Sequence, residues 1–192
     1  MKILQKSFFR EPTIEVAKKL LGKFIVSKTP KGVIVGKIVE TEAYLQNDPA
    51  SHSFCGKTNR NSPMFDSAGT SYVYFTYGMY YCFNVVTNKK NIGEAVLIRA
   101  IEPIRGIELI KKNRKVPKNK DLTNGPAKLT LALGINKNFN GINLLDEKSP
   151  LKLMKDKVEN FEIIETKRIG ISKGCKMPYR FYIKGSKWIS RK

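Results

Sequence analysis

The sequence predicts a single α+β domain, with helices packed around a curved antiparallel or mixed β-sheet and one protruding β-hairpin that carries a tyrosine at its tip. Three observations predict this. The length of 192 residues suits one domain with a sizeable core. A 41% hydrophobic fraction with 10% aromatic residues is typical of a folded globule. Segments of strand and helix periodicity alternate without a βαβα rhythm, which argues against a parallel sheet. Residues 1–192 contain no evident repeat or linker and are expected to form one domain.

The first quarter of the chain predicts a helix followed by a hairpin. Pro12 is suited to begin a short helix, and Gly22 is suited to end it. The turn residues Pro30-Lys31-Gly32 separate two apolar stretches, as in an antiparallel hairpin. A long loop in a compact domain is usually functional. The expected elements are a flexible arm (1–9), a helix (12–21), two strands (23–29 and 33–44) and a long polar loop (46–66).

Five of the eight tyrosines lie in residues 70–86, where the pattern predicts a second hairpin. Polar and apolar residues alternate at the period of a strand, and Gly78 can adopt the positive φ of a tight turn. Cys82 and Asn84 then share one face of the returning strand, and Phe83 lies on the other. Tyr77 falls at the turn, where an exposed ring is costly unless it inserts into something. The alternative is a tyrosine-rich hairpin of the hydrophobic core.

The second half of the chain predicts further strands and two more helices. Arg99 is the one charge in an otherwise apolar strand, and Trp188 is expected in the core or in a lid. Gly125-Pro126 and Gly134 mark the ends of a helix. The expected elements are strands over 94–101, 161–171 and 179–184, a short helix led in by Pro103 and Arg105 that carries Ile104, Ile107 and Ile110, a basic loop over 111–120, and a helix to about Leu133.

The charge of the chain points to a polyanionic partner. The net charge is +20, from 36 Lys plus Arg against 16 Asp plus Glu, which is more than solubility requires. Lys outnumbers Arg and is spread along the chain, which favours contact with backbone phosphates over reading of base edges. A lysine-rich proteome would produce part of this excess by itself.

Cofactors, metals and membranes find no support in the sequence. The three cysteines are widely spaced, no CxxC is present, and His52 is the only histidine, so a zinc site is not expected. The glycine motifs of nucleotide-binding loops are absent. No signal-peptide core and no run of about 18 apolar residues occurs. We expect an intracellular, reduced protein without cofactor, cytoplasmic or associated with the nucleoid.

Two carboxylates near the end of the long strand are the first candidates for chemistry. On a regular strand Ile38, Glu40, Glu42 and Tyr44 share one face, which does not suit a buried sheet. Either this face is wet, or the two Glu pair with some of the many Lys. The functional alternative makes one Glu a general base beside an aromatic platform.

Three cations or potential cations accompany them. A lone histidine such as His52 is more often a bystander than a catalyst, although its polar loop leads to the tyrosine hairpin. Arg99 needs a partner within its apolar strand. The structural alternative is a salt bridge to Glu40 or Glu102. The functional alternative is that Arg99 holds a water or a phosphate near Glu42. Lys128 lies in the first turn of its helix, where backbone N–H groups favour anions.

Seven short segments follow, in order, the pattern of one known family. They are Val39–Leu45, His52–Ser53, Tyr72–Asn84, Leu97–Pro103, Gly125–Leu129, Arg168–Ile171 and Tyr179–Ser190. Together they resemble the alkyladenine (3-methyladenine) DNA glycosylase family, from about Ala17 to Ser190. The first two motifs together are quite specific.

The resemblance implies a monomer that removes damaged purines from double-stranded DNA without a cofactor or metal. Glu42 would activate the attacking water, and Arg99 and the carbonyl of Ile169 would hold it. The flipped base would lie among Tyr44, His52 and Tyr74. The remaining roles are exclusion of the 2-amino group of guanine (Asn84), insertion into the duplex (Tyr77, with Met79 beside it) and phosphate contact (Arg60, Lys128 and Lys137).

Base flipping costs a few kcal/mol, and stacking of an aromatic ring is worth ~1–3 kcal/mol in return. An alkylated, cationic purine also stacks well on tyrosine rings. The expected product is a free purine released by a monofunctional enzyme of base excision repair, from alkylated or deaminated sites. Two alternatives remain at this point: a nucleic-acid-binding protein without catalysis, and a bifunctional glycosylase–lyase that uses a lysine as nucleophile.

Overall fold

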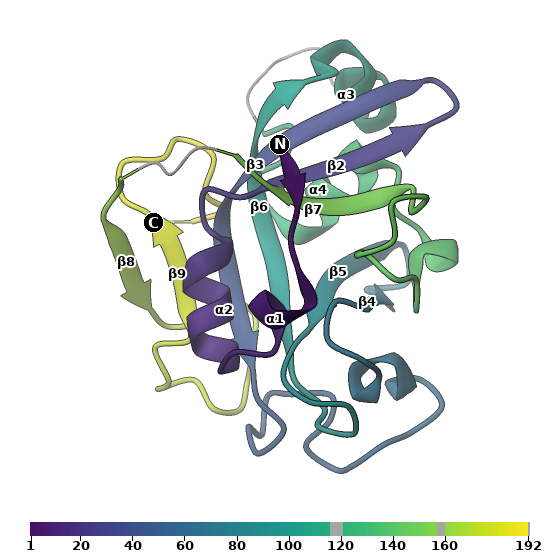
Figure 1. The fold of residues 1–192 in the computed structure, drawn as a ribbon. Coiled ribbons are helices and arrows are strands. Elements are labelled where there is room, and N and C mark those ends of the chain that lie inside the picture. Colours follow the sequence, from purple (N-terminus) through teal and green to yellow (C-terminus); the bar gives the residue numbers. More distant parts are fainter. Residues whose placement is uncertain (116–120, 157–159, 192) are drawn as a thin grey trace.

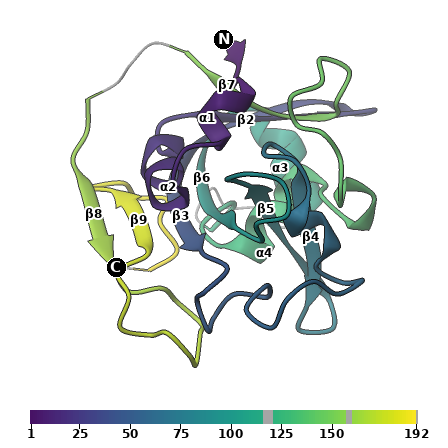
Figure 2. The ribbon, with the colours of Figure 1, turned by 60° about the horizontal axis from the view of Figure 1, so that its bottom comes forward.

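The computed structural model describes residues 1–115, 121–156 and 160–191, which form a single domain (Figure 1). The described strands pair antiparallel in one sheet that curls into a half-barrel (Figure 2). The sheet order is β1-β7-β2-β3-β6-β5-β4, with β9 also paired to β3 and β8 to β9. The strands are β1 (Lys2–Ile3), β2 (Phe24–Thr29), β3 (Gly32–Tyr44), β4 (Ser71–Thr76), β5 (Tyr80–Val86), β6 (Ala95–Arg105), β7 (Leu151–Lys155), β8 (Ile163–Thr166) and β9 (Arg180–Ile183).

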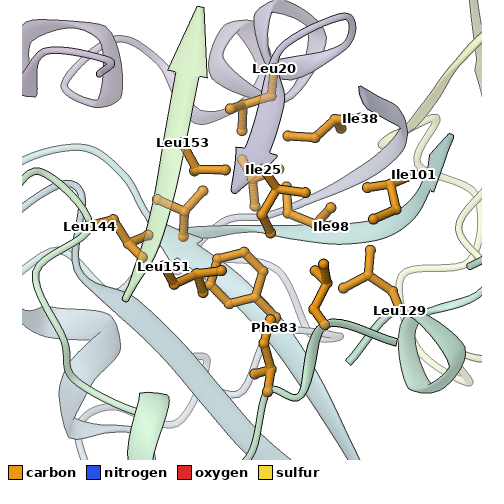
Figure 3. Packing of buried hydrophobic residues seen from close by; sticks show 14 of the residues in the cluster. Leu20, Ile25, Ile38, Phe83, Ile98, Ile101, Leu129, Leu144, Leu151 and Leu153 are labelled. Atoms are coloured by element: carbon orange, nitrogen blue, oxygen red, sulfur yellow. The ribbon is translucent and has the colours of Figure 1, made fainter. Parts of the chain in front are cut away.

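Four α-helices among the described residues pack against this sheet. They are α1 (Lys6–Phe9), α2 (Thr13–Leu20), α3 (Ile107–Arg114) and α4 (Pro126–Leu133), accompanied by single 3₁₀ turns at Ser62–Phe65 and Lys137–Phe139. Helix α2 lies beside β3 and β9 (Figure 1). The core fills the space between the sheet and the helices with fully buried aliphatic side chains and Phe83 (Figure 3). No helix in the described part of the chain is both long and apolar enough to cross a membrane.

The N-terminal residues, expected to form an arm, are packed on the sheet. Strand β1 pairs with β7, and the Leu4 N–H donates to the Leu153 carbonyl at 3.0 Å. The Leu4 and Phe9 side chains are buried in the core. Strand β7, which provides this anchor, was not expected, because five residues in which Lys and apolar side chains alternate carry little signal on their own.

Three further segments differ from expectation. Strand β6 extends to Arg105, so Ile104 lies on a strand, half exposed, and not on a helix. Helix α3 continues to Arg114 into the expected basic loop, of which residues 116–120 lie outside the described residues. In the expected strand 161–171 only β8 is regular. The later residues of that segment form a loop, whose hydrogen bonds go to the end of β3 instead of to a paired strand.

A bulge in β3 decides which side chains face the core. The pairing of β3 with β6 shifts by one residue between Ile38 and Glu40, where β3 has an extra residue, and shifts back between Glu40 and Thr41, where β6 has one. Ile38 therefore belongs to the hydrophobic core, and the Thr41 hydroxyl bonds to the Ala17 carbonyl of α2. Glu40 and Glu42 point to the polar side. The expectation that Ile38 shares their face was wrong, because a one-residue offset reverses the face of every later side chain.

The tyrosine hairpin forms as expected. Strands β4 and β5 pair Tyr72 with Asn84 and Tyr74 with Cys82 on one face, and Phe83 on the other face enters the core. The turn places Tyr77 at φ 50° and Gly78 at φ 67°. Positive φ is uncommon for a bulky residue and indicates local strain. The Tyr77 side chain is 82% exposed, so the hairpin tip is not part of the core.

Candidate active site

A pocket of about 510 Å³ opens where the tyrosine hairpin meets the end of β3. This volume lies within the range of small-molecule sites, about 300–1,000 Å³. Its walls come from six separate parts of the chain: the end of β3, the polar loop 49–64, β4 with β5, the middle of β6, the start of α4 at Pro126 and the loop 169–173. Eight residues predicted from the sequence line it together: Tyr44, His52, Arg60, Tyr74, Tyr77, Asn84, Arg99 and Ile169.

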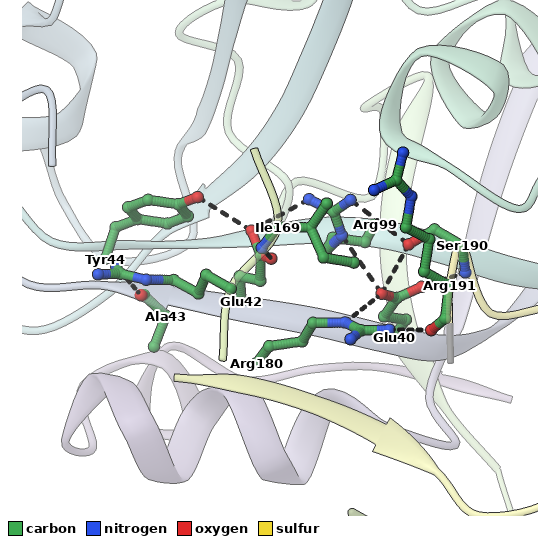
Figure 4. A network of polar contacts seen from close by, with 10 residues as sticks. Glu40, Glu42, Ala43, Tyr44, Arg99, Ile169, Arg180, Ser190 and Arg191 are labelled. Atoms are coloured by element: carbon green, nitrogen blue, oxygen red, sulfur yellow. Dashed lines mark hydrogen bonds and ion pairs between the residues drawn. The ribbon is translucent and has the colours of Figure 1, made fainter. Parts of the chain in front are cut away.

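Glu42 lies directly beneath this lining and has no exposed surface. Its Oε1 accepts the backbone N–H of Ile169 at 2.8 Å. Its Oε2 accepts the Tyr44 hydroxyl at 2.9 Å and Nη1 of Arg99 at 3.2 Å (Figure 4). All three donors belong to residues that line the pocket. The carboxylate is therefore fixed in orientation, and Oε1 keeps a second lone pair for a further donor such as a water.

Arg99 lies between two buried carboxylates. Its Nε donates to Glu40 at 3.3 Å, its Nη1 to Glu42, and its Nη2 to the Ser190 hydroxyl at 3.4 Å. Burial by itself lowers the pKa of this guanidinium, but the carboxylates of Glu42 and Glu40 outweigh burial and raise it. Of the two partners expected for Arg99, Glu40 is confirmed, whereas Glu102 pairs with Lys37 at the sheet surface.

Glu40 anchors the C-terminal segment to the floor of the site. Its carboxylate accepts Nε of Arg180 at 2.6 Å, and the Ser190 N–H and hydroxyl at 2.6 and 2.8 Å (Figure 4). The two carboxylates thus have different surroundings. Arg99 donates to both carboxylates, but the other donors to Glu40 belong to the scaffold (Arg180 and Ser190), whereas the other donors to Glu42 belong to the pocket wall (Tyr44 and Ile169). Neither lies on a wet face, and the partners are Arg and not Lys.

A second buried ion pair holds the loop that contributes Ile169. Arg168 donates from Nη2 to Asp48 Oδ1 at 3.0 Å and from Nη1 to Asp48 Oδ2, and Nη1 also reaches the Ala43 carbonyl at 2.9 Å. The guanidinium carbon of Arg168 lies 4.6 Å from the centre of the Tyr44 ring. Burial and the nearby Glu42 carboxylate raise the pKa of Tyr44, so its hydroxyl stays a donor.

Aromatic side chains form the wall opposite. His52 Nδ1 and the Tyr72 hydroxyl are 2.9 Å apart, and the His52 and Tyr74 rings meet edge to face at 4.6 Å. The Asn84 amide donates to the Tyr72 carbonyl at 3.0 Å, which fixes it in the wall. Burial, and then the positive charge of Arg60, lower the pKa of His52. Burial raises the pKa of Tyr72 to about 12. These aromatic side chains are therefore neutral near pH 7, whereas Arg60, Arg99 and Lys173 bring positive charge to other parts of the lining.

The remaining predicted residues lie outside the pocket lining. Met79 is 63% exposed beside Tyr77 at the hairpin tip. Lys128, in the first turn of α4, is held by Asn124 at 3.0 Å and Asp121 at 3.4 Å. Lys137 begins an exposed 3₁₀ turn. Among the described residues, no group of three or more His, Cys, Asp or Glu is arranged to hold a metal ion.

Several residues of the site were not found from the sequence. Lys173 lines the pocket, Asp48 and Arg168 hold its rear wall, and Arg180 and Ser190 hold Glu40. Arg168, Arg180 and Ser190 stand in segments that resemble the family, but no role was predicted for them. Like Asp48, they act on partners more than a hundred residues away along the chain, and no local pattern reveals those pairings. For Ile169, the sequence pointed to its carbonyl, whereas the contact seen in the structure is made by its N–H.

A curled antiparallel sheet, a carboxylate beneath an aromatic pocket and an exposed aromatic hairpin form an arrangement suited to an enzyme that binds a flat, ring-shaped group. The comparisons with known proteins are more specific. Residues 7–187 match the methylpurine-DNA glycosylase family. The chain belongs to this family, and it is a DNA glycosylase, a hydrolase of N-glycosyl bonds that removes alkylated purines in base excision repair. Family membership sets aside the alternative of a binding protein without catalysis.

Curated relatives agree over their whole length. A protein of Francisella tularensis subsp. tularensis (strain FSC 198) is 58% identical over 189 residues, which cover 97% of this chain and 98% of the relative. One of Carboxydothermus hydrogenoformans is 47% identical over 190 residues (99% and 100%), and one of Methanoculleus marisnigri is 45% identical over 193 (98% and 99%). Each is described as a candidate 3-methyladenine DNA glycosylase.

Proposed function

We propose that this protein flips alkylated or deaminated purines out of double-stranded DNA and hydrolyses the N-glycosidic bond with a water activated by Glu42. The observation that carries the proposal is the position of Glu42, fully buried beneath the pocket floor with all three of its donors in the pocket wall. A carboxylate held in this way can take a proton from a water and face the positive charge that develops on the sugar.

The pocket wall suits a flat base. The base stacks among Tyr44, His52 and Tyr74, and these rings, which are uncharged near pH 7, do not repel a cationic purine. Asn84, fixed by the Tyr72 carbonyl, excludes the 2-amino group of guanine. Arg99 and the carbonyl of Ile169 hold the water.

Outside the pocket, the proposal assigns the contacts with the duplex. Tyr77 enters the gap left by the flipped base, with Met79 beside it. Arg60, Lys128 and Lys137 contact phosphates. The net charge of +20 supports a salt-dependent attraction to DNA. We expect the enzyme to act as a monomer inside the cell, without cofactor.

The test is release of free base from duplexes that contain 3-methyladenine, 7-methylguanine, hypoxanthine or ethenoadenine. The proposal predicts that free purine appears and that the DNA strand stays intact until alkali is added. No release from any of the four duplexes would contradict it. Strand cleavage without alkali, together with a protein–DNA adduct after borohydride reduction, would instead support the glycosylase–lyase alternative.

A further inference from the structure

The Tyr44 ring has a cation on the side away from the pocket. Tyr44 lines the pocket, whereas Arg168 does not. The guanidinium carbon of Arg168 lies 4.6 Å from the centre of the Tyr44 ring. Arg168 is only 5% exposed. The ring is therefore a partition between a permanent protein charge and the space in which a base would stack.

Arg168 cannot leave this position easily. Both of its terminal nitrogens bond to the Asp48 carboxylate, and Nη1 also bonds to the Ala43 carbonyl. Asp48 is itself buried and accepts the Ala50 N–H at 3.0 Å. The Nε of Arg168 is buried without a hydrogen-bond partner. A buried N–H without a partner is unfavourable, so the bonds to Asp48 and Ala43 must hold the guanidinium where it is. These bonds fix it against the face of the Tyr44 ring.

We propose that Arg168 sets the charge preference of the pocket by stacking on the rear face of Tyr44. The inference rests on the proposed function, since it concerns the base that stacks on the front face. A cation over one face of an aromatic ring draws on the same electron density that attracts a cation to the other face. Arg168 thereby weakens the attraction of Tyr44 for a cationic purine and leaves the stacking of a neutral purine largely unchanged. The affinities of the enzyme for cationic and neutral lesions are therefore closer to each other than they would be if no cation lay behind Tyr44.

The test compares affinities for duplexes with cationic 7-methylguanine and neutral hypoxanthine, measured in a Glu42→Gln background so that both bases stay attached. The measured quantity is the ratio of the two affinities. Arg168→Met alone would leave the buried Asp48 carboxylate unpaired, so the charge is removed in the double variant Asp48→Asn/Arg168→Met. Arg168→Lys keeps the charge and is the matched control.

The proposal predicts that the double variant shifts the affinity ratio toward 7-methylguanine by about threefold to tenfold. Asp48→Asn alone removes the carboxylate that compensates Arg168, so it shifts the ratio toward hypoxanthine. In a Tyr44→Leu background neither change moves the ratio, because the ring that transmits the effect is gone. If the double variant does not fold, the direction in which Asp48→Asn shifts the affinity ratio tests the proposal instead. A shift toward hypoxanthine supports it, and a shift toward 7-methylguanine overturns it.

An equal loss of affinity for both duplexes would overturn the proposal and leave Arg168 with a structural role only. An unchanged ratio, or a shift that persists in the Tyr44→Leu background, would overturn it as well. Failure of the proposed function is recognised separately, by rapid release of base from the Glu42→Gln protein during the binding measurement.

Discussion

The backbone N–H of Ile169 donates a 2.8 Å hydrogen bond to Oε1 of Glu42, although 127 residues separate them in the chain. This bond closes the loop after β8 over the end of β3 and completes the floor of the pocket. Because the donor is a backbone group, the contact depends on the path of the loop and not on the Ile169 side chain. Arg168, the preceding residue, holds that path through Asp48 and the Ala43 carbonyl.

The Tyr44 hydroxyl is expected to contribute to catalysis separately from its ring. Tyr44→Phe removes the 2.9 Å hydrogen bond to Glu42 and keeps the surface on which a base stacks. A hydrogen bond to a charged group is worth about 1.5–3 kcal/mol, so the excision rate should fall roughly 10- to 100-fold. Affinity for an abasic-site duplex should stay unchanged. Single-turnover rates check this, and a Tyr44→Phe protein with the wild-type rate would show that the hydroxyl plays no part.

The hairpin tip should show opposite effects on binding and stability. Tyr77 is strained at φ 50° and 82% exposed, so Tyr77→Asn should leave the melting temperature unchanged or raise it. The same substitution removes the ring that is proposed to enter the duplex. Affinity for lesion-containing DNA should fall about 5- to 150-fold, from a stacking energy of ~1–3 kcal/mol. Equal affinity of the two proteins for that DNA would eliminate the wedge.

His52 should titrate below the ordinary histidine value. Burial and Arg60 lower its pKa in the folded protein, so the folded state binds fewer protons than the unfolded state just below about pH 6.5. As pH falls from about 6.5 through the folded-state pKa, stability decreases, and the charged ring also repels a cationic base. Since His52 is the only histidine, one imidazole resonance in an NMR titration reports it directly. Titration at or above about 6.5 would refute the expected direction.

Arg99 should contribute strongly to the stability of the fold as well as to the chemistry. Arg99→Met leaves the buried carboxylates of Glu40 and Glu42 without their shared cation, and breaking such a pair costs about 3–5 kcal/mol. The exposed Arg105 on the same strand provides the control, and Arg105→Met should cost less than about 0.5 kcal/mol. Urea denaturation of both variants measures the difference. Similar midpoints would mean that the buried network contributes little to stability.

Local patterns predicted a large part of this fold, because the signals are local. The β2–β3 and β4–β5 hairpins follow from alternation and turn residues, and α4 follows from Pro126 and Gly134. Strand β7 and the packed N-terminus could not be predicted in the same way. Their hydrogen bonds join segments about 150 residues apart, and neither segment has a strong pattern alone.

The residues of the candidate site likewise fall into two groups: those that sequence motifs identified and those that only the fold reveals. Tyr44, His52 and Tyr74 stand in motifs that resemble the family, so the sequence pointed to them, and the structure brings them to one pocket. The supporting residues, such as Asp48 and Ser190, act only through partners that folding brings near. The bulge at Glu40 is also invisible in a strand pattern, although it decides that Glu42 and not Ile38 faces the site.

Single-turnover release of 7-methylguanine by Glu42→Gln measures the catalytic role of Glu42 most directly. The matched control is Glu102→Gln, which makes the same change at a partly exposed salt bridge on the neighbouring strand. Glu42→Gln should lose at least about a thousandfold in rate, the scale of a lost general base with its electrostatic contribution. It should keep its affinity for an abasic-site duplex, and Glu102→Gln should release base at the wild-type rate. Release by Glu42→Gln at the rate of Glu102→Gln would contradict the account.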